Sequence, residues 1–241
     1  MIADPKYFRT ESGTLAPLRV NSFDFVRFVA AVSVLLSHHL LLSGLYPEPY
    51  IPGIKDTLGG AAVSAFFGIS GFLIFKSGLS ASDWADYFSA RILRLFPNLL
   101  VCVFTVALVT LVVFDNYDNW RSHAEWVLWN LQMILTGGVD YAIDGIFEEQ
   151  PNTSVNGSLW TLPYEFWMYV LVFPICLLKS QFRLITLISV YFLFCHLWAN
   201  GSWQESSRFL TIGFVSLALG KLGAFFMAGA IVSLLFSDYI R

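Results

Sequence analysis

The sequence predicts an all-α protein that crosses a membrane several times, and three observations support this prediction. Of its 241 residues, 56% are hydrophobic and only 13% are charged, and the mean hydropathy is +0.65. A soluble domain carries about 25% charged residues, so half that density cannot cover a water-facing surface. Several stretches also approach the roughly 20 apolar residues that a spanning helix needs. We therefore expect a polytopic membrane helical bundle with six to seven spanning helices in this chain.

The expected spans follow one another along the chain. They cover residues 21–42, 57–75, 95–114, 159–178, 182–199 and 209–236. The last stretch is long and contains Lys221 near its middle, so we expect either two short segments or one broken helix there. Residues 125–135 are apolar on one side but too short to span, and we interpret them as an interfacial or re-entrant helix.

The placement of lysine and arginine predicts the orientation of these spans. If residues 1–20 form a cytoplasmic N-terminal segment, nine Lys and Arg residues lie inside and three lie outside, while Arg27 and Lys221 fall within spans. The acidic loop 115–158, which holds the short helix, then lies outside. We expect an integral membrane protein with a cytoplasmic N-terminus.

The charge and the cysteines exclude two further classes of site. A net charge of −3 and a pI near 5.7 provide no basic field for nucleic acid, so we expect no nucleic-acid partner. The three cysteines, Cys102, Cys176 and Cys195, lie in apolar runs without the clustered ligands of a metal site or a disulfide framework. We interpret them as buried small hydrophobic residues and predict no bound metal.

Ionisable groups inside spans are costly and are therefore candidates for function. In the first span, Arg27 and His38 are eleven residues apart, so they share one helix face at a separation of about 16 Å. Asp24 can pair with Arg27 at i,i+3. His39 points about 100° away from His38, and we interpret it as a packing or interface residue. For His38, the alternative to a functional role is a structural hydrogen bond between helices.

Arg91 and Arg94 lie three residues apart, just before the third expected span. Their guanidinium groups should neighbour each other on the inner side, where a fixed pair suits a phosphate clamp. Ordinary positive-inside anchoring explains the same pair equally well. Spacing alone leaves both alternatives open.

Glu165 lies six residues into the fourth expected span, where a carboxylate needs a partner. The expected topology puts Glu165 about 9 Å, and His38 about 6 Å, below the outer ends of their spans, so the two can meet. A histidine beside a carboxylate is typical of a general base with its orienting group. A buried structural pair is the alternative.

Four motifs stand in order along the chain. Arg27 is followed after ten residues by His38, residues 66–74 read FFGISGFLI, Arg91 and Arg94 form R-x-x-R, and residues 157–166 read GSLWTLPYEF. Together they resemble the motif series of the acyltransferase-3 family, the membrane O-acyltransferases of bacterial cell-surface modification. The resemblance covers residues 21–236. Because members have about ten spanning helices, we expect the membrane acyltransferase domain, residues 21–241, to be incomplete at its C-terminus.

The resemblance implies a reaction and a set of partners. An acyl group, most often acetyl, is transferred from cytoplasmic acyl-CoA to a hydroxyl of a cell-surface carbohydrate or its lipid-linked precursor, in the bacterial inner membrane. Arg27, Arg91 and Arg94 would hold the CoA phosphates on the inner side. His38 would be the catalytic base, with Glu165 as the orienting or stabilising carboxylate.

Two other classes of function remain open on the sequence. A transporter or flippase for a glycan or a small anionic substrate also places charged residues within its helices, and a non-catalytic membrane partner or sensor is the third alternative. No inverted repeat is visible in the sequence, and the four motifs favour the enzyme.

Overall fold

Helices form nearly all of the structure, a computed structural model that describes residues 7–9, 15–17, 22–43, 46–150, 152–201 and 212–236. The α-helices are α1 Ser22–Ser43, α2 Leu58–Ser80, α3 Trp84–Val113, α4 Trp120–Thr136, α5 Thr161–Leu177, α6 Ser180–Asn200 and α7 Ile212–Phe236. The 3-10 helices are η1 Tyr117–Asn119 and η2 Gly157–Trp160. Two short antiparallel ribbons pair β1 Tyr7–Arg9 with β2 Leu15–Pro17, and β3 Tyr50–Ile51 with β4 Asp56–Thr57.

Within the described residues, six helical segments are long and apolar enough to cross a membrane. They are α1, α2, α3, α6, Gly157–Leu177 and Leu217–Phe236. The predicted all-α polytopic bundle is therefore confirmed. The 17-residue α4 is not among the six, which agrees with its interpretation as a helix that does not span.

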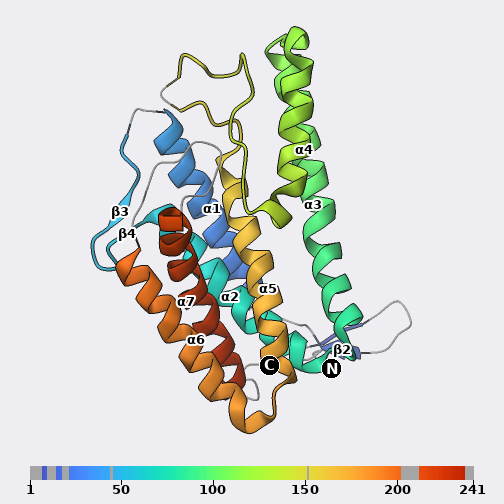
Figure 1. The fold of residues 1–241 in the computed structure, drawn as a ribbon, viewed down its shortest axis with the longest axis vertical. Helices are drawn as coiled ribbons and strands as arrows, with labels where there is room; N and C mark the ends of the chain where they lie inside the picture. Colours follow the sequence, from blue (N-terminus) through green and yellow to red (C-terminus); the bar gives the residue numbers. More distant parts are fainter. Residues whose placement is uncertain are drawn as a thin grey trace.

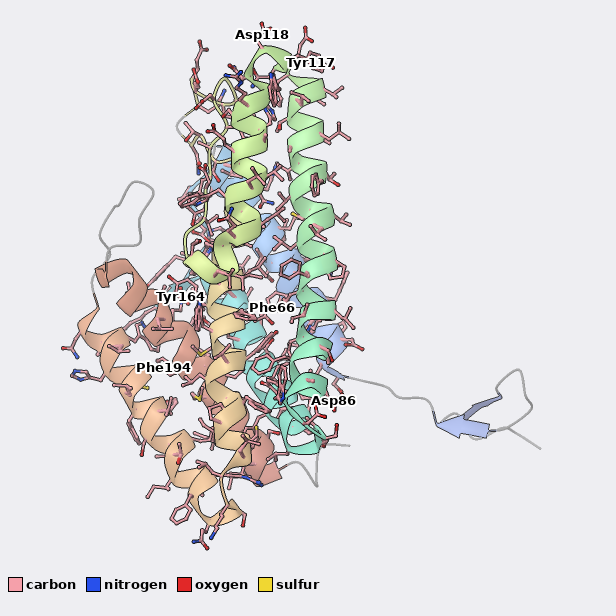
Figure 2. The ribbon with its side chains drawn as sticks, turned by 45° about the vertical axis from the view of Figure 1, so that its right-hand side comes forward. Phe66, Asp86, Tyr117, Asp118, Tyr164 and Phe194 are labelled. Carbon is pink, nitrogen blue, oxygen red and sulfur yellow. The ribbon has the colours of Figure 1, made fainter. Side chains whose placement is uncertain are left out.

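The helices alternate in direction (Figure 1). In that view α1, α3 and α6 run upward and α2, α5 and α7 run downward, so the α2–α3 and α5–α6 connections lie at the lower end. The turn between α3 and α4 lies at the opposite end, where Figure 2 labels Tyr117 and Asp118 far above Asp86. This alternation puts the turn between α3 and α4 on the side opposite the α2–α3 connection, and α4 then runs back down beside α3.

The close approach of α2 and α7 forms the centre of the bundle. A Cβ atom added to Gly71 would overlap the carbonyl oxygen of Phe226, and one added to Gly229 would overlap the carbonyl oxygen of Gly68. Small residues at such crossings let two helix backbones pack in contact where lipid supplies no hydrophobic drive. The sequence places glycine at the positions that this crossing requires.

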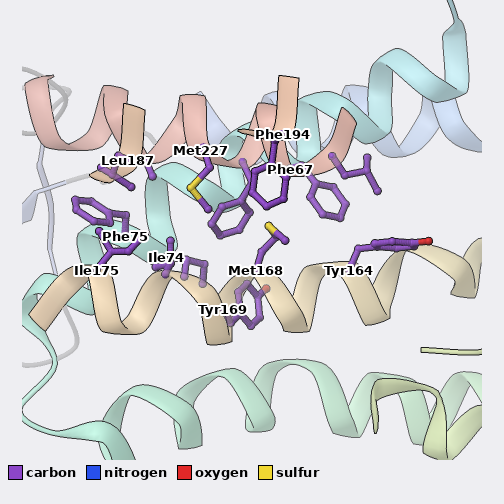
Figure 3. Packing of buried hydrophobic residues seen from close by; sticks show 14 of the residues in the cluster. Phe67, Ile74, Phe75, Tyr164, Met168, Tyr169, Ile175, Leu187, Phe194 and Met227 are labelled. Atoms are coloured by element: carbon purple, nitrogen blue, oxygen red, sulfur yellow. The ribbon is translucent and has the colours of Figure 1, made fainter. Parts of the chain in front are cut away.

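Two apolar clusters form the core, and one of them contains this crossing. The larger lies where α5 and α6 pack on the α2–α7 pair (Figure 3), and it includes the fully buried Phe75, Tyr169, Leu187 and Met227. The second joins α3 and α4 to the chain that leads into α5, through residues such as Trp126 and Ile146. The irregular segment before α5 is thus packed into the molecule, as its buried side chains require.

The start of α3 corrects one expectation. The helix begins at residue 84 rather than 95, because the Asp83 side chain caps it by accepting a hydrogen bond from the Asp86 N–H. Arg91 and Arg94 therefore lie inside a 30-residue helix and not before it, and Pro97 lies within the helix without ending it.

The last helix corrects another expectation. From residue 212 onward α7 is one continuous helix, neither two segments nor a broken one, while residues 209–211 lie outside the described residues. The Lys221 ammonium lies 2.6 Å from the Asp56 carboxylate, and both side chains are about four-fifths buried. Because an ion pair compensates the charge, the helix accommodates a lysine in its middle without a break.

We predict opposite outcomes for two alanine substitutions on α2. Gly71→Ala should destabilise the bundle, since its methyl group meets the Phe226 carbonyl, and overpacking of this kind costs about 1–3 kcal/mol. Gly68→Ala is the matched control, because its Cβ would lie at an ordinary 3.7 Å from the Phe225 carbonyl oxygen. Thermal unfolding in detergent should show a lower Tm only for Gly71→Ala; equal Tm values would contradict the close crossing.

Candidate active site

A cavity of about 950 Å³ lies between α1, α2, α3, the start of α5 and the segment before α5. Four of the five candidate residues from the sequence line it: Arg27, His38, Arg94 and Glu165. The fifth, Arg91, is not part of the lining. Side chains from four separate helices and a loop are therefore brought to one internal space.

His38 is held by its own helix. Its Nδ1 atom lies 2.8 Å from the carbonyl oxygen of Val34, one turn earlier in α1. A carbonyl oxygen can only accept, so the proton of the neutral ring is assigned to Nδ1, and Nε2 keeps a free lone pair. The partly buried His38 is therefore in the tautomer that a general base requires.

Glu165 has partners other than the histidine that the sequence suggested. Its Oε1 atom accepts hydrogen bonds from the Tyr169 hydroxyl, one turn later in α5, and from the Ser70 hydroxyl of α2 at 3.3 Å. No hydrogen bond joins Glu165 to His38 among the interactions of the described residues. The general-base and orienting roles of the two residues stay predictions.

Arg27 lies near a second arginine. Its Nη1 atom is 3.9 Å from the Asp24 carboxylate, as the i,i+3 spacing predicts. The positive charge of Arg94 repels the Arg27 guanidinium, and the negative charge of Glu165 attracts it. Its Nη2 atom is buried and has no hydrogen-bond partner among the described residues. An unpaired buried donor costs about 1–3 kcal/mol, so this guanidinium is poised for a further acceptor.

Arg91 and Arg94 face different surroundings, although the sequence suggests that their guanidinium groups are neighbours. Arg91 is only 4% exposed, and its guanidinium lies 3.9 Å from the centre of the Tyr87 ring while Nη1 donates to the Tyr87 carbonyl oxygen at 2.8 Å. Arg94 is exposed and lines the cavity. Arg91 thus packs against its own helix, whereas Arg94 is available to a ligand.

Several residues in or beside the cavity wall were not predicted from the sequence. His39 contributes to the cavity wall beside His38, although its direction on the helix suggested packing. Tyr169 does not line the cavity but bonds Glu165, and it could have been found because a residue four positions after Glu165 lies on the same helix face. Ser70 lies in the motif of residues 66–74 without a predicted role, and Asn98 and Ser154 carried no signal, since their closeness to the cavity depends on how the helices pack.

Among the described residues there are six apolar spans, and four of them line a cavity with arginine, histidine and carboxylate side chains, which defines an integral membrane protein with a site for polar groups inside the bundle. The chain belongs to the acyltransferase-3 family, whose profile, described as an acyltransferase domain, matches residues 20–239. The resemblance suggested by the four motifs is therefore confirmed.

Two relatives of the chain have descriptive names. The chain is 40% identical over 152 residues to an O-acetyl transferase of Shigella phage Sf6, and 32% identical over 159 residues to nodulation protein 10 of Rhizobium leguminosarum bv. viciae. The matches cover 63% and 62% of this chain but only 44% and 42% of the two relatives, so the chain spans less than half of their length. No solved structure is significantly similar to the chain.

Proposed function

We propose that the chain forms part of a membrane O-acyltransferase that moves an acyl group, acetyl by default, from cytoplasmic acyl-CoA to a hydroxyl of a cell-surface carbohydrate or its lipid-linked precursor. Membership of the family and the similarity to a phage O-acetyl transferase support the reaction class. The observation that carries the proposal is a shared cavity, in which His38 lies about 16 Å along α1 from Arg27.

Arg27 and Arg94 are proposed to hold the phosphates of acyl-CoA. Both line the cavity, Arg27 has an unpartnered buried donor, and planar guanidinium groups bind phosphate oxygens in pairs. Before acyl-CoA binds, the negative charge of the Glu165 carboxylate offsets part of the positive charge of the two arginines. Arg91 is assigned a positioning role instead, because it stacks on Tyr87 and does not line the cavity.

His38 is proposed to act as the general base. Its Nε2 atom removes the proton of the acceptor hydroxyl, the oxygen attacks the thioester carbonyl carbon, and the C–S bond breaks. The proton then passes from Nε2 to the departing CoA sulfur, so an O-acyl ester and CoA thiol are formed. The Val34 carbonyl oxygen holds the ring through Nδ1 and stabilises the imidazolium that forms in between.

The proposal has a direct test that also separates it from a transporter. Membranes containing the full chain are incubated with labelled acetyl-CoA and lipid-linked glycan. Transfer of label to the glycan, with release of CoA thiol, is the expected result. Uptake of either compound into vesicles without new ester would assign the chain to the transporters and overturn the enzyme.

We predict that His38→Ala abolishes transfer while membrane insertion is kept, because an apolar residue is cheaper than histidine in a span. Removal of a general base reduces the rate by about 10²–10⁴-fold. His39→Ala, on the neighbouring position of the same helix, is the matched control and should have a much milder effect. If the His38 variant keeps full activity at equal membrane abundance, His38 is not the base.

We predict that Arg94→Ala raises the KM for acyl-CoA, and that Arg94→Lys restores it only in part, because lysine lacks the bidentate fork. Arg91→Ala should instead lower the Tm, since it removes the buried stack on Tyr87, with little change in KM for the folded fraction. Measurement of the KM for acyl-CoA and of the Tm for both variants tests whether Arg94 binds the acyl donor and Arg91 stabilises the fold. The same KM as the unmodified protein for Arg94→Ala would favour simple anchoring at the membrane surface.

We further propose that the N-terminal segment is cytoplasmic, in a bacterial inner membrane, as the excess of Lys and Arg on one side supports. Cysteines introduced at residues 140–150 should then react with an impermeant thiol reagent applied to intact cells. A cysteine at Ser80, the last residue of α2 before the α2–α3 connection, should react only after the cells are opened. The reverse labelling pattern would contradict the cytoplasmic position of the N-terminal segment.

A further inference from the structure

The segment that leads into α5 forms one end of the cavity. All eight residues from Ser154 to Thr161 contribute to the lining. They include the extended stretch before η2 and the 3-10 helix itself, and α5 begins only at residue 161. His38 and His39 of α1 line the same cavity.

This segment lies at membrane depth. The Asn156 amide nitrogen lies 3.2 Å from the sulfur of Cys102, in the middle of the apolar part of α3. Figure 2 shows Tyr164, in the first turn of α5, far below Tyr117 in η1, which follows α3. Non-helical backbone at such depth is tolerated only where it is buried in protein or lines a water-filled cavity. The segment therefore belongs to the wall of the cavity and is not a lipid-facing loop.

The chemistry of the segment is polar but uncharged. The Ser154 Oγ atom is buried without a hydrogen-bond partner among the described residues, so its hydroxyl has unused capacity for a hydrogen bond. The Asn156 side-chain oxygen Oδ1 accepts hydrogen bonds from the Ser158 N–H at 3.0 Å and from the Ser158 hydroxyl at 2.7 Å, and these two bonds hold the local turn. A Cβ on Gly157 would meet only Ser154 Oγ, at an ordinary 3.5 Å.

Aromatic surface completes this wall. The partly exposed Trp160 ring lines the cavity and packs edge-on against Tyr164, with 5.8 Å between ring centroids. A ring held in this way offers an apolar platform, while nearby hydroxyl and amide groups fix the orientation of a bound molecule. The two residues proposed to bind the phosphates of acyl-CoA, Arg27 and Arg94, lie on α1 and α3 and not in this segment. Uncharged hydroxyls beside an aromatic face suit a neutral polyhydroxylated ring.

We propose that residues 154–160 form the acceptor subsite, which binds a carbohydrate ring and presents one of its hydroxyl groups to His38. This inference rests on the proposed acyl transfer and adds the location and the chemistry of the acceptor. Ser154 donates to or accepts from a sugar hydroxyl, Gly157 leaves the space for the ring, and Trp160 packs against its apolar face.

Two substitutions test the subsite by kinetics. Ser154→Ala removes the unpartnered hydroxyl, and Gly157→Val narrows the cavity from a position where a Cβ makes only an ordinary 3.5 Å contact. Each should raise the KM for the acceptor by about tenfold or more while the KM for acyl-CoA changes little. Thr153→Ala and Gly53→Val are the matched controls, since neither residue lines the cavity. An unchanged acceptor KM, or an equal rise in both KM values, would overturn the subsite.

A binding measurement separates this subsite from the reaction itself. In a Cys176→Ala, Cys195→Ala background, Cys102 remains as the cavity thiol, and its alkylation rate is followed with a small uncharged reagent. Methyl α-glucoside and methyl α-galactoside should slow alkylation, and Ser154→Ala should remove the protection. Protection without any acyl transfer would overturn the proposed function and leave the subsite standing. Protection of Cys102 by CoA but by neither glycoside would show that this end of the cavity binds the acyl donor, and it would overturn the acceptor subsite.

Discussion

Hydrocarbon offers no hydrogen-bond partners, and the arrangement of this chain depends on pairing its polar groups within itself. Lys221 of α7 and Asp56 of the β3–β4 ribbon pair across the bundle. The buried Ser37 of α1 accepts a hydrogen bond from the Gly59 N–H of α2, and its hydroxyl donates to Glu48. The first contact joins elements 165 positions apart and the others join α1 to the next helix and to the connection between them, so the positions of the helices follow from polar contacts as well as from apolar packing.

The cavity is a region where this pairing is incomplete. Arg27 Nη2 and Ser154 Oγ are buried without partners, and both residues line the same space. Glu165 is satisfied by Tyr169 and Ser70, yet it also attracts the Arg27 guanidinium. Unpaired buried donors cost stability, and a site that binds anionic and hydroxyl groups recovers that cost when its ligands enter. The same atoms that weaken the empty bundle are those that a donor and an acceptor would use.

The sequence predicted the spans well because hydrophobic length alone determines which segments can cross a bilayer. By the same criterion of length, the 17-residue α4 is not among the six apolar spans of the described residues. The start of α3 was missed because the Asp83 cap extends a helix through residues whose composition is polar. The continuity of α7 was missed because the partner of Lys221 lies 165 positions away in the sequence.

The candidate site was predicted only in part. Because an α-helix repeats every 3.6 residues, the spacing of Arg27 and His38 was enough to predict that they lie on one face of α1. Arg91 and Arg94 are the same residue type one helical turn apart, so the sequence does not distinguish them. In the structure, the contact with Tyr87 identifies Arg91 as the buried residue, whereas Arg94 lines the cavity. The depth of residues 154–160 depends on how far the chain returns into the bundle after α4. No local pattern records that path.

The shortness of α5 has a consequence for the membrane around it. Its 17 residues extend about 25 Å, whereas the 30 residues of α3 extend about 45 Å. The membrane span in this part of the chain runs from Gly157 to Leu177, so η2 completes it at the cavity end. Beside the start of α5, a hydrocarbon core of about 30 Å is therefore bordered by the cavity and not by a full-length α-helix. A polar group that enters by the cavity crosses less hydrocarbon than one that follows the whole length of α3.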